Sequence, residues 1–200
     1  MSPAQRPVGA LACACQLSHL ISRTLRHVYE PSPDRNFHQQ EGEHIQGTLS
    51  ACFTMLIDGS LDTPKPHCTG LSLVSSALLI FHESTSLSST REVNGSGIGS
   101  DEESTPDSVL GSVSSQMAAL CIRLCGSNPG SSTATISPFV GHALYQSALV
   151  QHGLWRVTGD ESFRTDFDSL VTALKTHTER WSSAEKYLTK MELLENLAVG

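Results

Sequence analysis

The sequence predicts an all-α fold, an irregular bundle of about six to seven helices with one long acidic, serine-rich loop. Apolar residues recur every three or four positions over most of the 200 residues, which is the spacing of one helix face. No segment alternates apolar and polar residues with the period of two that a half-buried strand requires. Serine or threonine followed by proline opens two of the segments, as at the start of many helices.

Length and composition fit one hydrophobic core with polar loops. A chain of 200 residues is only slightly longer than a typical domain of about 150. Its net charge of −7 provides no basic field for the phosphates of nucleic acids. The 6 cysteines follow no regular spacing, which predicts reduced thiols in an intracellular protein. The longest apolar runs, 8–15 and 78–81, fall far short of the roughly 20 residues that cross a membrane.

Residues 1–83 are expected to form the N-terminal helical part. The first helix covers 8–29; its start imitates a weak signal peptide, but the same period continues into polar sequence, as in an amphipathic helix. Residues 33–46 are polar and predict a loop. A second helix is expected over 47–57, and a third, apolar on nearly all sides, over 70–83. The positions of the first helix that we expect to face inward are Leu11, Cys15, Leu20, Ile21, Leu25 and Val28.

Residues 84–104 are expected to be a disordered linker or insertion. They are rich in serine, threonine and glycine, contain the acidic run 101–103, and cannot bury enough apolar surface to offset chain entropy. The glycines of 95–99 lack the lysine of a phosphate-binding loop. Ser100 precedes the acidic run and Thr105 precedes proline, so both are candidate phosphorylation sites. A phosphate on Thr105 would lie at a helix N-terminus, where the helix dipole stabilises it.

Residues 105–200 are expected to form the C-terminal helical part of the same domain. Helices are predicted over 105–124 and 137–151, each opened by a hydroxyl residue and a proline. After a break at 153–160, the tail carries the most regular apolar spacing in the chain. That tail forms either one long helix or two helices with a small kink near His177.

No group of residues predicts catalysis or a metal site. Cys121 with Cys125, and Cys15 with His19, share a helix face, but a structural zinc site needs four ligands. No Gly-x-Ser-x-Gly elbow is present. We therefore predict no catalytic residue, no cofactor and no metal, and a protein that is not an enzyme. The remaining polar candidates, expected to be solvated or structural, are Arg23, Arg26, His27, His38, His44, His142, Asp166, Asp168, His177 and Glu179.

Four segments follow one another in an order that resembles a known family. Residues 17–29 form a helix ending in tyrosine, and 73–82 form an apolar helix ending in histidine. Ser137-Pro138-Phe139 leads into a helix with Tyr145, and the tail carries a Trp-x-x-Ala-x-x-Tyr pattern at 181–187. Together these segments resemble the C-terminal part of the regulatory "middle homology" domain of fungal binuclear zinc-cluster transcription factors. The closely spaced cysteines and basic residues of that family's DNA-binding module are not in this sequence. Where the family often continues from the histidine into Arg-Pro, His82 is followed by Glu83 and Ser84.

The resemblance implies a helical regulatory domain, or a fragment of one, that acts on transcription in the nucleus without contacting DNA itself. Its partners would be proteins of the transcription machinery, a second copy of the chain, or a small-molecule effector. Two alternatives stay open: a helical protein-interaction or scaffold module with no transcriptional role, and a helical enzyme that binds a small molecule. The residues expected to carry the core are Phe139, Tyr145, Phe167, Leu170, Leu174, Trp181 and Tyr187.

Overall fold

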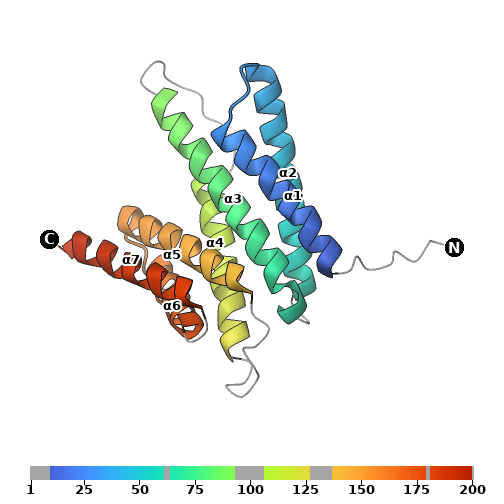
Figure 1. The fold of residues 1–200 in the computed structure, drawn as a ribbon. Coiled ribbons are helices and arrows are strands. Elements are labelled where there is room, and N and C mark those ends of the chain that lie inside the picture. The colour runs from blue at the N-terminus through green and yellow to red at the C-terminus, as the bar shows by residue number, and fades with distance from the viewer. Residues whose placement is uncertain (1–9, 61–63, 93–105, 127–136, 179–180, 200) are drawn as a thin grey trace.

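The computed structural model describes residues 10–60, 64–92, 106–126, 137–178 and 181–199, and in these ranges the chain is α-helical without a strand (Figure 1). This confirms the predicted fold class for the described residues. None of the described helices is long and apolar enough to cross a membrane. In chain order the helices are α1 (Ala10–Tyr29), α2 (Arg35–Ser60), α3 (Pro64–Glu92), α4 (Pro106–Gly126), α5 (Pro138–Thr158), α6 (Glu161–Thr178) and α7 (Ser182–Val199).

Helix α3 lies at the centre of the arrangement because it is apolar on most of its circumference. It contacts α1 and α2 on one side and α4 and α5 on the other (Figure 1). The first core cluster is built mainly from α1 to α4, and the second mainly from α5 to α7. Leu71, Val74 and Leu78 of α3 are almost fully buried in the first cluster. The burial of this helix joins the two halves of the bundle.

Helix α2 corrects the prediction of a loop over 33–46, because the helix begins at Arg35. A side-chain oxygen of Asp34 accepts hydrogen bonds from the backbone N–H groups of Asn36 (3.0 Å) and Phe37 (3.1 Å). Asp34 is therefore the N-cap residue of α2, because it accepts hydrogen bonds from N–H groups that have no partner within the helix. Ile45 then buries its side chain in the core. The polar appearance of the segment reflects the exposed face of a helix.

Helix α3 also extends beyond its predicted range of 70–83. It begins at Pro64 and ends at Glu92, so the expected disordered linker over 84–104 is wrong for 84–92. Once the apolar turns around Leu78 have formed, adding helical residues costs little, since the nucleus is already present. The rest of the predicted linker, with Ser100 and the glycines of 95–99, lies outside the described residues. Thr105, the expected cap of the next helix, lies outside them too.

The boundaries of α5 follow from its terminal residues. The Ser137 hydroxyl accepts a hydrogen bond from the Phe139 N–H (3.4 Å), and Pro138 takes the first helical position. The helix continues past the predicted end at 151 and ends before Gly159, whose φ of 72° is a left-handed conformation. Glycine adopts this conformation without the steric cost of a Cβ atom. The Gly159 N–H then bonds the carbonyl of Trp155 at 2.8 Å.

The C-terminal tail forms two helices, which settles the alternative left open by the sequence. Helix α6 ends at Thr178 and α7 begins at Ser182, with residues 179–180 outside the described part. The N–H of Trp181 bonds the carbonyl of His177 at 2.9 Å, and its own carbonyl accepts from the N–H of Ala184. Trp181 therefore belongs to the junction between the two helices as well as to the packing around it.

The expected core is confirmed in part. Phe167, Leu170 and Leu174 are buried in the second cluster. Phe139 is wrong as a core residue, because its side chain is 52% exposed. Trp181 and the ring pair of Tyr145 and Tyr187 are only half-buried; the two tyrosine rings stack with centroids 4.7 Å apart.

The inward face of α1 differs from the predicted one. Leu11 is 80% exposed, and Cys15 and Leu25 are exposed as well. Leu20 is buried as predicted and Ile21 packs against the core, but the buried face also passes through Leu17, Thr24 and His27. Thr24 can lie there because its hydroxyl donates to the Leu20 carbonyl at 3.0 Å, which satisfies its hydrogen-bonding need.

Candidate binding groove

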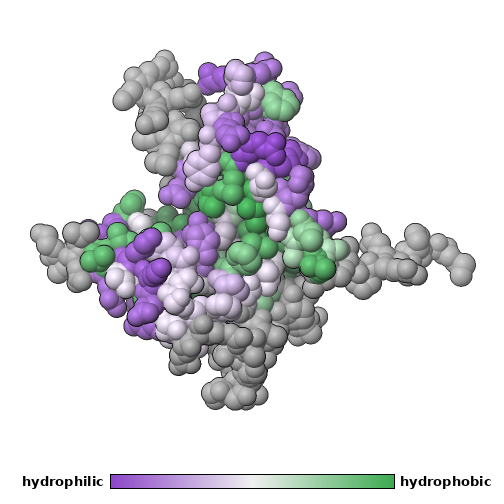
Figure 2. Space-filling model, in the orientation of Figure 1, coloured by the Kyte–Doolittle hydropathy of each residue, from purple (hydrophilic) through white to green (hydrophobic). Residues whose placement is uncertain are grey.

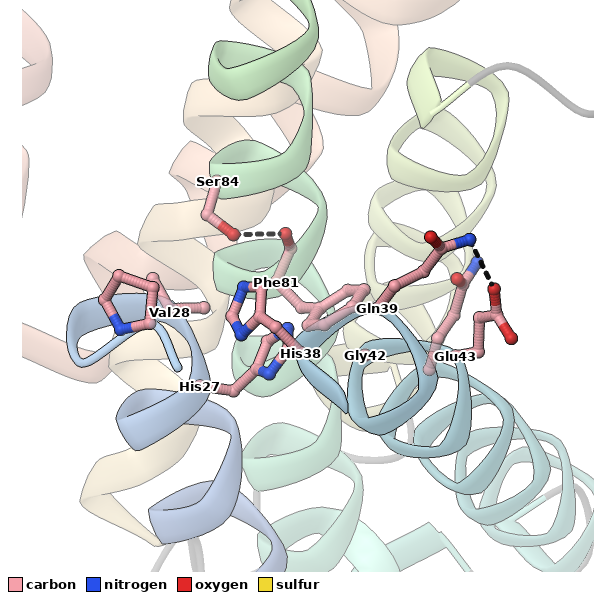
Figure 3. Close-up of a pocket in the computed structure, with 10 residues that line it drawn as sticks. His27, Val28, His38, Gln39, Gly42, Glu43, Phe81 and Ser84 are labelled. Atoms are coloured by element: carbon pink, nitrogen blue, oxygen red, sulfur yellow. Dashed lines mark hydrogen bonds between the residues drawn. The ribbon is translucent and has the colours of Figure 1, made fainter. Parts of the chain in front are cut away.

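A groove of about 470 Å³ lies where α1 ends and α2 begins, against the side of α3 (Figure 3). It brings together aromatic rings, side-chain amides and a carboxylate from three helices. Hollows of this volume are within the range of small-ligand sites. Its lining residues include His27 and Val28 from α1, His38, Gln39 and Glu43 from α2, and Phe81 and Ser84 from α3.

Two imidazole rings stack at the centre of this groove. The rings of His27 and His38 have centroids 3.9 Å apart and planes inclined by 13°, and Figure 3 shows them lying against each other. His27 in turn packs on Phe81, with centroids 5.7 Å apart. The correction of 33–46 from loop to helix matters here, because α2 is what holds His38 against His27.

Glu41 connects this pair to a neighbouring arginine. Its carboxylate lies 3.3 Å from Nη2 of Arg23 and 3.5 Å from Nδ1 of His27. Burial lowers the pKa of His27, with a further lowering from His38, and Glu41 only partly opposes both. Burial acts to raise the pKa of Glu41, but the hydrogen bond and positive charge of Arg23, together with the neighbouring His27, outweigh it and hold that pKa below its ordinary value. Near neutral pH the cluster therefore favours a neutral His27 beside an ionised Glu41.

Gly42 permits this close approach of α1 and α2. A Cβ atom built at Gly42 would lie 3.0 Å from Nε2 of His27 and 3.7 Å from Cζ of Phe81. The first distance is shorter than ordinary van der Waals contact, and the His27 ring already stacks on His38. A residue with a side chain would have to displace the stack.

A second, smaller hollow of about 300 Å³ lies further along the same pair of helices. Cys13 and Cys52 both line it, together with Leu20, Arg23 and Met55. Burial raises the pKa of the Cys52 thiol, and the nearby Cys13 adds to the effect. The Cys52 thiol is thus held in the protonated form, which is the less nucleophilic one.

The paired metal-ligand candidates do not assemble a site in the described part of the chain. Cys15 and His19 are both exposed on α1. Cys121 and Cys125 fall within α4, at positions whose side chains lie outside the description. Among the described residues, no group of three or more histidine, cysteine, aspartate or glutamate side chains is placed to hold a metal ion.

The other polar candidates are dispersed over the C-terminal helices. The Tyr187 hydroxyl lies 3.4 Å from Nδ1 of His142, and burial lowers the pKa of His142. His177 is buried, and its pKa is lowered for the same reason. Asp168 pairs with Arg164 at 3.4 Å within α6, whereas Glu179 lies outside the described residues. Among the described residues, the structure does not bring these groups into one site.

His27 is a groove residue that the sequence does not single out, since it predicts only a solvated or structural side chain there, as at Arg23 and Arg26. The available signal was its position on the face of Leu17, Leu20 and Thr24 at helical spacing. Arg26 is exposed, as expected. No pattern in the sequence indicated that His38 would lie against His27, because that contact depends on the antiparallel return of α2.

The described residues define an all-α bundle with a groove formed by its first three helices. Comparisons of the chain with protein-family models, with curated proteins and with solved structures find no match.

Proposed function

We propose that the chain is a helical regulatory module of the kind found in fungal zinc-cluster transcription factors, and that it acts by binding a partner or effector. The four segments that resemble that family fall on α1, α3, α5 and the junction leading into α7. The observation that carries a binding role is the groove around His27, His38 and Phe81, which joins three helices. Occupation of such a groove changes how those helices pack, and regulation requires a change of this kind.

The groove supplies recognition groups rather than a reactive centre in this proposal. Its aromatic rings provide stacking surfaces, while Gln39 and Glu43, hydrogen-bonded to each other at 3.1 Å, provide polar contacts. The net charge of −7 argues against direct DNA contact, because a DNA-binding surface needs an excess of positive charge. In this role the protein acts in the nucleus as a regulator, and another protein binds the DNA.

A reporter assay tests this role. The full chain is fused to a heterologous DNA-binding domain with an activation segment, and reporter expression is compared with that of the same fusion without the chain. We expect a change of several-fold, which His38→Ala reduces because it truncates the stacked ring in the groove. His44→Ala is the matched control, since His44 is exposed on the same helix. Equal expression with and without the chain would contradict the proposal.

Exposed apolar side chains favour a second candidate, a helical protein-interaction module without a transcriptional role. Leu193 and Leu194 are exposed on α7. Figure 2 shows further hydrophobic residues along the middle of one face, over α3, between hydrophilic surfaces. This candidate predicts an inactive reporter fusion together with self-association that Leu193→Asp weakens. Analytical ultracentrifugation of both proteins measures that difference.

A further inference from the structure

We propose that the stacked His27–His38 pair is a proton-sensitive latch, which holds the end of α1 against the start of α2 near neutral pH and releases it when both rings are protonated. This inference does not depend on the transcriptional role. It rests on the placement of two titratable rings where α1 closely approaches a glycine of α2.

The stacking geometry opposes a second proton. The ring centroids are 3.9 Å apart, so two imidazolium ions would face each other at contact distance. The first positive charge can be balanced by Glu41, which lies 3.5 Å from Nδ1 of His27. Arg23 already occupies the other oxygen of that carboxylate at 3.3 Å. One carboxylate thus faces one arginine and two histidines, and the doubly protonated pair has excess positive charge.

The surrounding groups do not cancel this excess. Helix α3 presents Phe81 to His27, and His82 meets the edge of Phe81 with centroids 5.7 Å apart. Burial lowers the pKa of His82, so this ring resists protonation, and an imidazole carries no negative charge that could offset the pair. The charged groups that act on His27 are Arg23 on α1 and Glu41 on α2, besides its partner His38. Glu43 on α2 and Glu83 on α3 are exposed, so solvent screens their carboxylates.

The packing lets the pair open without unfolding the bundle. Helices α1 and α2 contact each other less than either contacts α3, so their mutual contact is the weaker one. Because position 42 is a glycine, the His27 ring lies in close contact with α2. When His27 moves away, position 42 has no side chain that could take over this contact. Repulsion between the rings therefore acts on the weakest contact among the first three helices.

Hydrogen exchange of the full chain tests the latch. Protection of amides at 26–42 is compared between about pH 7.5 and about pH 5.5, after correction for the intrinsic pH dependence of exchange. The opening constant is the equilibrium ratio of the released to the held state, and protection falls as it rises. Each extra proton that the open state binds raises this constant by up to about tenfold per pH unit, so we expect protection to fall at least about tenfold. Peptides from α4, a helix with no histidine, serve as the internal reference.

Two variants distinguish a latch from general acid instability. His38→Phe keeps a flat ring against His27 but cannot take a proton, so the acid response at 26–42 should disappear. His44→Phe makes the same change at an exposed site on α2 and should keep the response. Glu41→Gln should shift the response to lower pH, because it removes the carboxylate that stabilises a protonated His27. An acid response in His38→Phe equal to that of the natural sequence overturns the proposal.

A second measurement decides the matter if His38→Phe does not fold. In the natural sequence, the imidazole C2 protons of His27 and His38 are followed by NMR across the same pH range. The latch predicts coupled titration, with the second proton binding at lower pH than the first. Two independent titration curves, each unaffected by Glu41→Gln, would overturn the proposal.

Discussion

The side-chain amide of Gln151 on α5 donates a hydrogen bond of 2.8 Å to the hydroxyl of Ser114 on α4, at a position fully shielded from solvent. The same nitrogen lies 3.0 Å from the hydroxyl of Ser115. The Ser114 hydroxyl itself donates back into its own helix, to the carbonyl of Leu110 at 2.7 Å. A polar network thus links α4 to α5, and its directional bonds favour one register of the two helices.

Replacing Gln151 tests this network. Gln151→Ala should lower the free energy of unfolding by about 3 kcal/mol, because it leaves a cavity and removes the bonds to α4. Gln40→Ala, at an exposed position on α2, should change it by about 0.5 kcal/mol or less. Urea unfolding followed by circular dichroism measures both. Equal midpoints for the two variants would show that the network contributes no net stability.

Two glycines of α2 should respond in opposite directions to alanine. Gly47 has no atom within 4 Å of an added Cβ, so Gly47→Ala should stabilise the protein by about 1 kcal/mol through helix propensity. Gly42→Ala should instead destabilise it by about 1 kcal/mol or more, because the new methyl group would press on the stacked His27 ring. Thermal unfolding of the two variants provides the comparison. Stabilisation by both would mean that the ring can move away freely.

The aromatic residues of the C-terminal helices should differ in how much each contributes to the free energy of unfolding. Phe167 is almost fully buried, so Phe167→Ala should cost about 3–5 kcal/mol. Trp181 is half-buried at the α6–α7 junction, so Trp181→Ala should cost less, about 2 kcal/mol. Chemical unfolding midpoints check the order. An unchanged midpoint for Trp181→Ala would show that the junction does not contribute to the core.

Stability should fall as the pH is lowered below about 6.5. Burial lowers the pKa values of His82, His142 and His177, as it does that of His27, so the folded state binds protons less readily than the unfolded chain. The stability that depends on neutral histidines is complete above the unfolded pKa and is lost as the pH falls toward the folded values. The thermal midpoint measured from about pH 7.5 to about pH 5 reports this loss.

A matched pair of histidine variants identifies the source of this pH dependence. His177→Gln removes a buried titrating group and should make the midpoint vary less with pH. His19→Gln, at an exposed position on α1, should leave the slope unchanged. A slope that is the same in His177→Gln as in the natural sequence would assign the acid sensitivity to other groups.

The sequence alone was sufficient to predict the all-α class and most of the C-terminal helices. Helix starts such as Ser137-Pro138 depend on a hydroxyl, a fixed φ angle and a few neighbouring residues, so local sequence specifies them. The buried positions Phe167, Leu170 and Leu174 followed from spacing alone, because α6 has one clearly apolar face. These features are properties of single helices.

The tertiary structure decided what the local pattern left ambiguous. Polar residues 35–46 are helical because Asp34 caps them and Ile45 packs into the core, which the composition of the segment did not indicate. Thr24 and His27 are buried because neighbouring helices cover that face of α1, whereas Leu11 is left exposed. The stacking of His27 on His38 joins residues of two different helices, and only the return of the chain through α2 brings them within 3.9 Å. Helix periodicity is a local property of the chain, but the burial of a given face depends on which helix packs against it.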